Sequence, residues 1–85
     1  MLRIQRSSNG AVVFALIGRI EFDNVAELER LLSLEAVGQE IVLDLQDVTL
    51  VDRNAVRFLG RCEAEGVKLV NCPPYIRDWI EAERG

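Results

Sequence analysis

The 85-residue sequence contains no histidine, and it has only two cysteines, two prolines and few aromatic residues. Without histidine the chain lacks the commonest general acid–base group. A zinc site is not indicated either, because the two cysteines lie ten positions apart and have no histidine to complete a ligand set. A glycine-rich phosphate loop and a serine beside a base are also missing. The residues therefore do not indicate an enzyme.

Cys62 and Cys72 are too few to form a disulfide framework. A disulfide or a reactive thiol is the less favoured interpretation. We expect two small, buried, apolar side chains in a protein kept in a reducing compartment.

Long hydrophobic runs are also absent, although 49% of the residues are hydrophobic. The run Ala11–Ile17 is far shorter than the ~20 apolar residues of a membrane span, and Gly18 and Arg19 follow it directly. Met1 leads into a strand-like pattern rather than a secretory signal. We therefore expect one domain over residues 1–85, with no membrane span, in the cytoplasm.

Clustered positive charge is missing as well, since the net charge is −4 and the basic residues are scattered. Only Arg53, Arg57 and Arg61 form a local group. Phosphate backbones require clustered lysine and arginine, so nucleic acid is not the expected partner.

The central stretch Ile41–Leu59 organises the rest of the chain. Ile41–Leu45 is a short, nearly continuous apolar run, as in a strand buried on both faces. The next apolar positions follow a helical period, at Ala55, Phe58, Leu59 and Cys62. Between the two elements we expect a loop, Gln46–Asp52, in which Val48 and Leu50 pack inward. Asp52 stands where the helix N-cap would be.

The residues before this stretch predict a hairpin and a helix. Leu2–Arg6 alternates like an edge strand, Asn9 and Gly10 form a strong hairpin signal, and Ala11–Ile17 is the interior return strand that Gly18 ends. A helix follows, with Asp23 or Asn24 as its cap. Its apolar positions are Val25, Leu28, Leu31 and Leu32, with Leu34 as a further candidate.

The residues after it predict a further strand, Val67–Val70, and a last helix opened by Pro73 and Pro74. In that helix Ile76, Trp79 and Ile80 share one face, so Trp79 is expected in the core. The element order is then ββαβαβα, with the last three strands parallel.

Three segments of the chain resemble the STAS domain family, named after sulfate transporters and anti-sigma factor antagonists. They are Gly18–Leu28, reading GRIEFDNVAEL; the run LDLQDVTLVDRNAV; and Gly66–Ile80, reading GVKLVNCPPYIRDWI. The resemblance implies a shortened STAS-like α/β sandwich, with a mixed sheet of about four strands and three helices.

The chain departs from the family at the position of the phosphorylation site. In bacterial anti-sigma factor antagonists, a Ser or Thr two places after the conserved Asp is phosphorylated by a partner kinase. Asp52 matches that Asp, but Arg53 and Asn54 follow it, and Ala55 replaces the usual Gly. The resemblance therefore implies that Asn54 occupies the phosphosite without being phosphorylatable. Asn54 is also a residue that satisfies local backbone groups at a helix start.

For function, the resemblance implies a protein–protein interaction module that binds a histidine-kinase-like anti-sigma factor or serves in a signalling assembly. It involves no catalysis, cofactor or metal. The loop Gln46–Asp52 and the following helix start would make the contact. The candidate partner-binding residues are Glu21, Asp23, Asp47, Thr49, Asp52, Arg53, Asn54 and Arg57. Alternative functions are an accessory subunit of a transport system and a small-ligand sensor with a cleft above the central strand.

Three local hypotheses stay open at this point. The stripe Arg53, Arg57 and Arg61 is either a solvated face relieved by nearby Glu residues or a contact surface for an acidic partner. Asp44, Asp47 and Asp52 suggest Mg²⁺ coordination, but a helix cap with two solvated loop carboxylates is favoured. The exposed edge Val67–Val70 suggests a homodimer through the last strand.

Overall fold

The computed structural model describes residues 1–84. Its elements are β1 (Leu2–Asn9), β2 (Ala11–Ile20), α1 (Phe22–Ser33), β3 (Ile41–Val51), α2 (Arg53–Ala64), β4 (Lys68–Val70) and α3 (Pro74–Arg84). This confirms the predicted order ββαβαβα and the mixed sheet with three helices. In the described residues no helix is both long enough and apolar enough to cross a membrane.

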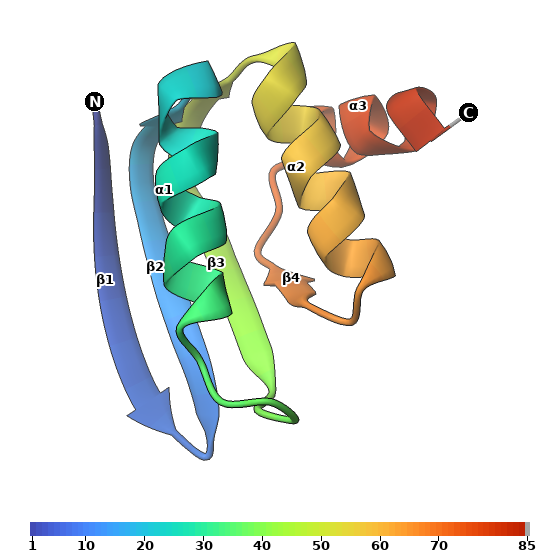
Figure 1. Ribbon diagram of the computed structural model, residues 1–85. Coiled ribbons are helices and arrows are strands. Elements are labelled where there is room, and N and C mark those ends of the chain that lie inside the picture. The colour runs from blue at the N-terminus through green and yellow to red at the C-terminus, as the bar shows by residue number, and fades with distance from the viewer. Residues whose placement is uncertain (85) are drawn as a thin grey trace.

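The strands form a four-stranded sheet in the order β1-β2-β3-β4. β1 pairs with β2 in the antiparallel sense, and β2, β3 and β4 are mutually parallel, as predicted. Each parallel crossover carries one helix, because parallel neighbours need a long return connection. Figure 1 shows α1 and α2 side by side in front of the sheet, with α3 beyond α2.

The core lies between the sheet and the helices. On β2 the alternate residues Val12, Phe14 and Leu16 are buried, whereas their neighbours on the opposite face are half-buried. The helical face predicted from its period is buried on α2: Ala55, Phe58, Leu59 and Cys62. Trp79 is only partly buried, although it does pack against the core as predicted. The buried face of the strands, with its period of 2, and the buried face of the helices, with its period of 3.6, thus pack against each other in one hydrophobic core.

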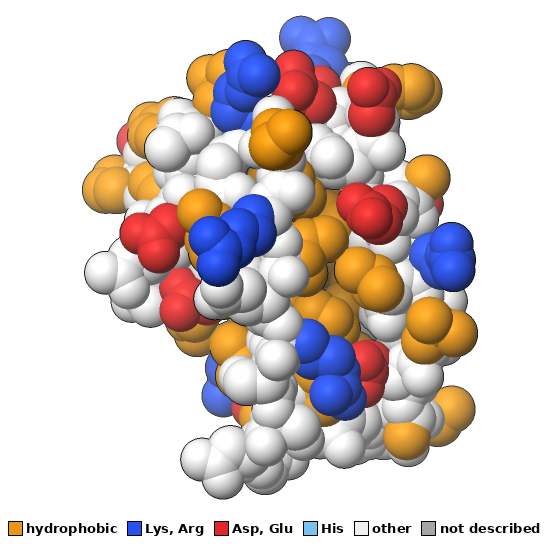
Figure 2. Space-filling model, turned by 90° about the vertical axis from the view of Figure 1, so that its left-hand side faces the viewer, with side chains coloured by type: hydrophobic (Ala, Val, Ile, Leu, Met, Phe, Trp, Pro, Cys, Tyr) orange, Lys and Arg blue, Asp and Glu red, His pale blue; other side chains and the backbone are white. Residues whose placement is uncertain are grey.

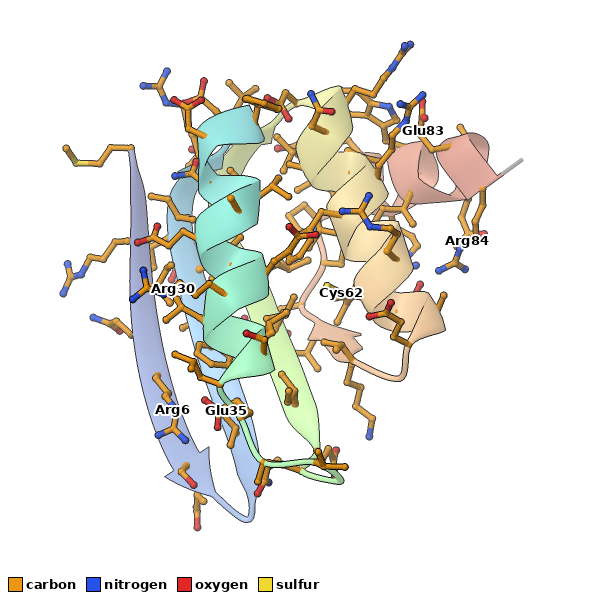
Figure 3. All side chains as sticks on the ribbon, in the orientation of Figure 1. Arg6, Arg30, Glu35, Cys62, Glu83 and Arg84 are labelled. Carbon is orange, nitrogen blue, oxygen red and sulfur yellow. The ribbon has the colours of Figure 1, made fainter. Side chains whose placement is uncertain are left out.

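The helix layer stops short of β1. Figure 2 looks onto this edge and shows hydrophobic side chains along a trough beside β1. The trough has a volume of about 360 Å³, and its apolar walls are Leu2, Ile4, Phe14 and Leu31. At its lower end Arg6 of β1 forms a two-pronged ion pair with Glu35, each N–O distance being 2.9 Å (Figure 3). This pair joins β1 to the segment after α1.

Gly18 does not end β2, contrary to the prediction. The strand continues to Ile20, and Gly18 adopts a φ of 103° at a shift in the pairing with β3. A glycine within a strand marks an irregularity as often as an end. A Cβ at Gly18 would lie 2.6 Å from the carbonyl oxygen of Met1, so the glycine permits β1 to approach.

β3 is also longer than predicted. The expected loop Gln46–Asp52 is strand as far as Val51. Leu45, Val48 and Val51 are buried at intervals of three, a spacing that strict strand alternation does not produce. The pairing with β2 shifts twice along this part of the strand. These irregularities explain why the segment reads as a connector in the sequence.

Two element starts differ from the predictions. α1 is capped by Glu21 rather than by Asp23 or Asn24, and Asn24 instead accepts a 2.9 Å hydrogen bond from the Glu21 backbone N–H through its side-chain oxygen. The prediction placed the cap too late because Asp and Asn are much commoner N-cap residues than Glu. β4 begins at Lys68, one residue later than predicted.

Candidate functional site

Asp52 connects the first turns of two helices. Its Oδ1 accepts a 2.9 Å hydrogen bond from the Ala55 backbone N–H, which confirms the predicted cap of α2. Its Oδ2 accepts a 2.8 Å hydrogen bond from the Phe22 backbone N–H at the start of α1. A carboxylate is suited to this position because both helix N-termini carry unpaired donors and partial positive charge. One side chain therefore fixes the starts of α1 and α2 relative to each other.

The predicted binding residues around this cap are mostly accessible. Those exposed are Asp23, Asp47, Thr49, Arg53, Asn54 and Arg57, and those half-buried are Glu21 and Asp52. Arg53 and Asn54 open α2 directly after the cap, on the surface. The start of α2, where Arg53 and Asn54 stand in place of a hydroxyl residue, is thus exposed to solvent.

The structure brings three of these residues into one hollow between α1 and α2. Asp23, Asn54 and Arg57 line this space of about 380 Å³ together with the apolar side chains of Phe22 and Val25. The remaining predicted residues do not line it. The predicted site is therefore divided between a shallow inter-helix hollow and the surface beside it.

Two exposed hydrophobic residues next to these positions were missed by the sequence interpretation. Phe22 is 66% exposed and Leu50 is 49% exposed. Leu50 was expected to pack inward with Val48, but only Val48 is buried. No sequence pattern marks Phe22 as exposed, because pattern reasoning expects hydrophobic residues inside. Exposed apolar residues beside arginine are typical of interface centres.

Asp47 and Thr49 belong to a strand, which corrects the predicted loop. Asp47 pairs with Ile17 of β2 in the sheet. The carbonyl oxygen of Thr49 accepts a 3.0 Å hydrogen bond from the hydroxyl of Tyr75 on α3. Both side chains are exposed, and Thr49 lies at a shift in the register between β3 and β2, where it has no paired residue.

The arginine stripe on α2 has partners within the chain. Arg53 and Arg57 both approach Glu83 of α3, with N–O distances of 3.7 and 3.1 Å. Arg61 approaches Glu29 of α1 at 3.2 Å. The hydrogen bond from Arg57, with the charge of Arg53, holds the pKa of Glu83 below its ordinary value. These contacts match the interpretation of a face relieved by nearby Glu residues.

The three arginines nevertheless remain largely exposed, at 66%, 55% and 55% of their side-chain surface. Exposed ion pairs of this kind contribute little net free energy, roughly 0–1 kcal/mol. A carboxylate from outside can therefore replace an internal one at small cost. The pairing does not remove these guanidinium groups from a binding surface.

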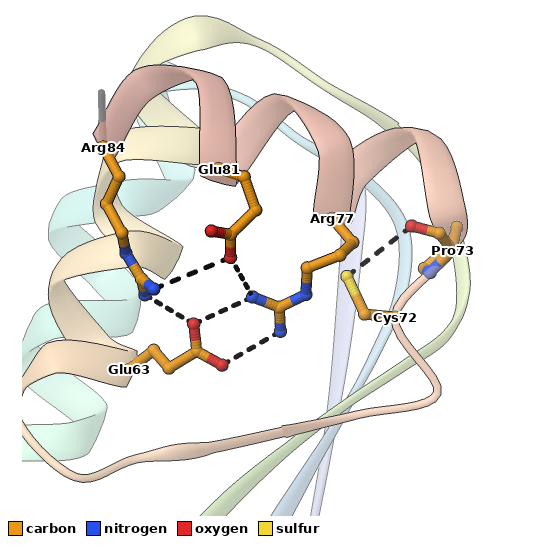
Figure 4. A network of polar contacts seen from close by, with 6 residues as sticks. All are labelled: Glu63, Cys72, Pro73, Arg77, Glu81 and Arg84. Atoms are coloured by element: carbon orange, nitrogen blue, oxygen red, sulfur yellow. Dashed lines mark hydrogen bonds and ion pairs between the residues drawn. The ribbon is translucent and has the colours of Figure 1, made fainter.

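The C-terminal half of α2 is joined to α3 by a second ionic network, drawn in Figure 4. Both oxygens of Glu63 accept hydrogen bonds from Arg77 at 2.9 Å, and Arg84 donates to the same carboxylate. These bonds lower the pKa of Glu63 to about 2, with that from Arg77 making the largest contribution, and raise the pKa of Arg77. α3 is thereby held against α2 along its length.

The three aspartates of the magnesium hypothesis do not form a site. Asp44 accepts hydrogen bonds from the Gln46 backbone N–H at 3.0 Å and the Asn71 side chain at 3.2 Å. Both oxygens of Asp52 are used by the two helices. Within residues 1–84, no three His, Cys, Asp or Glu side chains are arranged to hold a metal ion.

The two cysteines are free thiols. Cys62 lies on the buried face of α2, and burial raises the pKa of its thiol to about 12 (Figure 3). Cys72 is half-buried, and desolvation raises its pKa as well. Neither thiol is activated, since a reactive cysteine needs a lowered pKa.

Comparison with known proteins gives the following relatives. The family model described as STAS domain matches residues 4–82. The structure of the anti-sigma factor antagonist SpoIIAA in its unphosphorylated form has a TM-score of 0.64 at 17% identity, over 95% of this chain and 82% of that one. A protein from the DUF3478 family of Shewanella loihica PV-4, with a SpoIIAA-like fold, has a TM-score of 0.51 at 14% identity, over 81% of this chain and 60% of that one.

A larger protein, Mglu, contains a similar segment, with a TM-score of 0.55 and 26% identity over 79% of this chain. The chain spans only 18% of the length of Mglu. No curated protein matches the chain. The SpoIIAA-like neighbours bear out the α/β fold with its mixed sheet, and the match over residues 4–82 covers most of the sequence. The chain belongs to the STAS domain family.

Proposed function

We propose that the chain is a non-catalytic protein-interaction module that binds a kinase-like anti-sigma factor. The contact is made by a tip surface, defined as Phe22, Asp23, Leu50, Arg53, Asn54 and Arg57. The observation that carries the proposal is the shared cap: Asp52 holds the starts of both helices while Phe22 and Arg53 stay exposed beside it. Family membership and the likeness to an anti-sigma factor antagonist support this choice of partner.

The chemistry of the tip surface suits a protein partner. Aromatic and arginine side chains dominate the binding energy at many interfaces, where they pack into pockets from which water is excluded. Phe22 supplies such an aromatic group at the start of α1, and Arg53 supplies such a guanidinium at the start of α2; Asp52 hydrogen-bonds to the first turns of both helices. The other residues named from the sequence, Glu21, Asp47 and Thr49, would lie at the rim of the contact.

Asn54 makes the proposed binder insensitive to the family's usual switch. Phosphorylation adds nearly two negative charges, whereas the Asn54 amide adds none. The exposed amide would keep the tip surface in a state that resembles an unphosphorylated antagonist. Binding would then be constitutive or controlled through expression level.

The test is a calorimetric titration of the purified domain with the histidine-kinase-like anti-sigma factors of its host. We expect one of them to bind, and the variant Phe22→Ala to weaken binding about tenfold or more. Asn54→Asp should also weaken it by adding charge. Arg30→Ala is the control, because Arg30 is an exposed residue on the same helix outside the tip surface. Absence of binding, or equal affinity of Phe22→Ala, would contradict the proposal.

Phosphorylation is tested separately, by incubating the domain with ATP and the partner kinase and mapping phosphate by mass spectrometry. We expect no phosphate in the segment that contains Arg53 and Asn54. Phosphate on another hydroxyl, such as Thr49 or Ser33, would show that a switch exists elsewhere. The proposal of a constitutive binder would then be wrong.

Three other sequence predictions remain open. Co-purification of a transporter ATPase would support the accessory-subunit function, and a small molecule retained through purification would support the sensor function. A homodimer through Val67–Val70 would have to form on a β4 edge of only three residues. Light scattering at high protein concentration distinguishes that dimer from a monomer.

A further inference from the structure

A groove runs between α2 and α3 on the side of α2 that faces away from α1. Its volume is about 370 Å³. Its floor consists of Val56, Gly60, Ala64 and Ile80. Val56 and Ile80 are buried below it, Gly60 is half-buried, and Ala64 is exposed. Because Gly60 and Ala64 carry little or no side chain, the backbone of α2 is accessible along two consecutive turns.

The walls of the groove are basic in an otherwise acidic chain. Arg57, Arg61 and Arg84 line it, with Glu83 as the one acidic lining residue, whereas the whole sequence has a net charge of −4. Arg57 and Arg61 are one helical turn apart on α2, and Arg84 lies at the end of α3 (Figure 3). Positive side chains therefore flank a small, apolar floor from both helices.

Glu83 shows how these walls hold a carboxylate. Its two oxygens lie 3.7 Å from Nε of Arg53 and 3.1 Å from Nε of Arg57. Arg61 and Arg84 pair with carboxylates outside the groove, Glu29 and Glu63. The exposed Arg61–Glu29 pair exchanges at small cost, so the Arg61 guanidinium can turn to an incoming carboxylate. Arg84 stays in the Glu63 network and adds its positive charge to the wall of the groove.

We propose that the α2–α3 groove binds an acidic amphipathic helix of a partner protein. Small residues at a helix contact permit axes to approach to about 8 Å, and Gly60 and Ala64 provide such a surface. The apolar face of the incoming helix rests on this floor. Carboxylates one turn apart on the incoming helix meet Arg57 and Arg61, and Arg84 adds positive charge at the end of the groove. This mode lays a helix into a groove. The groove shares Arg57 with the tip surface, but its floor lies between α2 and α3.

A second copy of the chain is not the occupant that these features favour. Each of its helices already buries its apolar face in its own core, through Leu28 of α1, Phe58 of α2 and Ile80 of α3. No helix within residues 1–84 is left with an apolar face to place in the groove of a neighbour. These features favour an occupant outside residues 1–84 that carries the complementary charge.

The proposal is tested with a displayed library of helical peptides in which one face is randomised. Peptides that bind the whole chain are selected from this library. We expect enriched peptides to carry Asp or Glu one turn apart beside small apolar residues. Ala64→Trp fills the groove at an exposed position, and Arg61→Glu reverses one wall, so each should weaken binding at least tenfold. The matched controls are Ala82→Trp on α3 and Arg3→Glu on β1, both exposed and outside the groove. The controls should bind as the unmodified chain does.

Several outcomes would overturn the proposal. One is enrichment of neutral or basic peptides, and another is unchanged affinity when the acidic residues of a selected peptide become amides. Equal binding by Ala64→Trp, in a variant whose thermal unfolding shows that it is folded, would also exclude the groove. Amide chemical shifts that move at Phe22 and Asn54 instead of Gly60 would place the peptide on the tip surface. Phe22→Ala leaves the groove intact, so failure here is distinguishable from failure of the proposed function.

Discussion

At the scale of single residues, Asp52 accepts two hydrogen bonds, one from nearby Ala55 and one from Phe22, which lies 30 positions earlier in the sequence. The contact with Ala55 is local, and a helix-cap pattern predicts it. The contact with Phe22 depends on where β2 and β3 bring the two helix starts, and no local pattern reports it. Loss of the side chain would leave an unpaired donor at each of two helices.

Replacement of Asp52 by alanine should lower the free energy of unfolding by about 2 kcal/mol, because one cap and one inter-helix hydrogen bond are lost. Urea unfolding monitored by circular dichroism measures the change. Asp23→Ala is the matched control, since Asp23 is an exposed carboxylate in the first turn of α1. Its loss should cost only a few tenths of a kcal/mol. Equal effects of the two variants would show that Asp52 has no special role.

Gly18 offers a second test at this scale. Gly10 and Gly18 both have positive φ, at 87° and 103°, but only at Gly18 would a Cβ meet another atom within 3 Å, the carbonyl oxygen of Met1. Gly10→Ala should cost about 1 kcal/mol for the backbone conformation alone. Gly18→Ala should cost about 1–2 kcal/mol more and increase amide exchange at the start of β1. If Gly10→Ala and Gly18→Ala lowered the free energy of unfolding equally, the close approach of Met1 to Gly18 would not matter for stability.

At the scale of elements, the helices and the order of the strands could be predicted because their hydrophobic periods are regular. α2 is the clearest example, since the predicted face from Ala55 to Cys62 is the buried one. β3 shows the limit of this reasoning. Its burial at Leu45, Val48 and Val51 reflects irregular pairing with β2, which depends on a neighbouring strand rather than on the local sequence.

Gly60 should be replaceable within α2. A Cβ there would lie 3.7 Å from Cγ2 of Ile80, an ordinary van der Waals contact. Gly60→Ala should therefore raise the free energy of unfolding by about 0.5–1 kcal/mol through better helix propensity. A lower stability in thermal or urea unfolding would show that α2 and α3 cannot accommodate the added methyl group.

At the scale of the whole molecule, the class of fold could be predicted from the sequence. Which hydrophobic residues are exposed on the surface could not. Strand and helix periods specify which residues face a core, and they assign the rest only by default. Phe22 and Leu50 are hydrophobic, so the same reasoning would place them inside. Their exposure results from the way β2 and β3 end beside each other, which only the tertiary structure shows.

The acid stability of the whole chain should depend on Glu63. Its pKa is about 2 in the folded protein, below the ordinary 4.5, because Arg77 and Arg84 stabilise its charged form. The unfolded chain then binds a proton more readily, so the stabilisation is present above about pH 4.5 and is lost as the pH falls toward 2. The variant Glu63→Gln has no carboxylate to protonate at this position. Its free energy of unfolding should therefore fall less between pH 4.5 and pH 2 than that of the unmodified chain.

Urea unfolding at a series of pH values between these limits measures the effect. Glu65→Gln is the control, because Glu65 lies near the same helix end but forms no ion pair among the described residues. The control should keep the steep fall of stability in acid, whereas Glu63→Gln should flatten it. Identical slopes for both variants would mean that the network of Glu63 does not contribute to the pH dependence.

The double hydrogen bonding of Asp52 also has a consequence for the thermodynamics of association. A partner that meets α1 and α2 finds two helix ends whose mutual orientation is already set before the encounter. Little chain entropy then remains to be lost on complex formation, so a smaller part of the interaction energy is spent on ordering this surface and more of it appears as affinity. Severing the carboxylate bridge would let the two ends move independently, so a partner would be held less tightly even though every side chain it touches is unchanged.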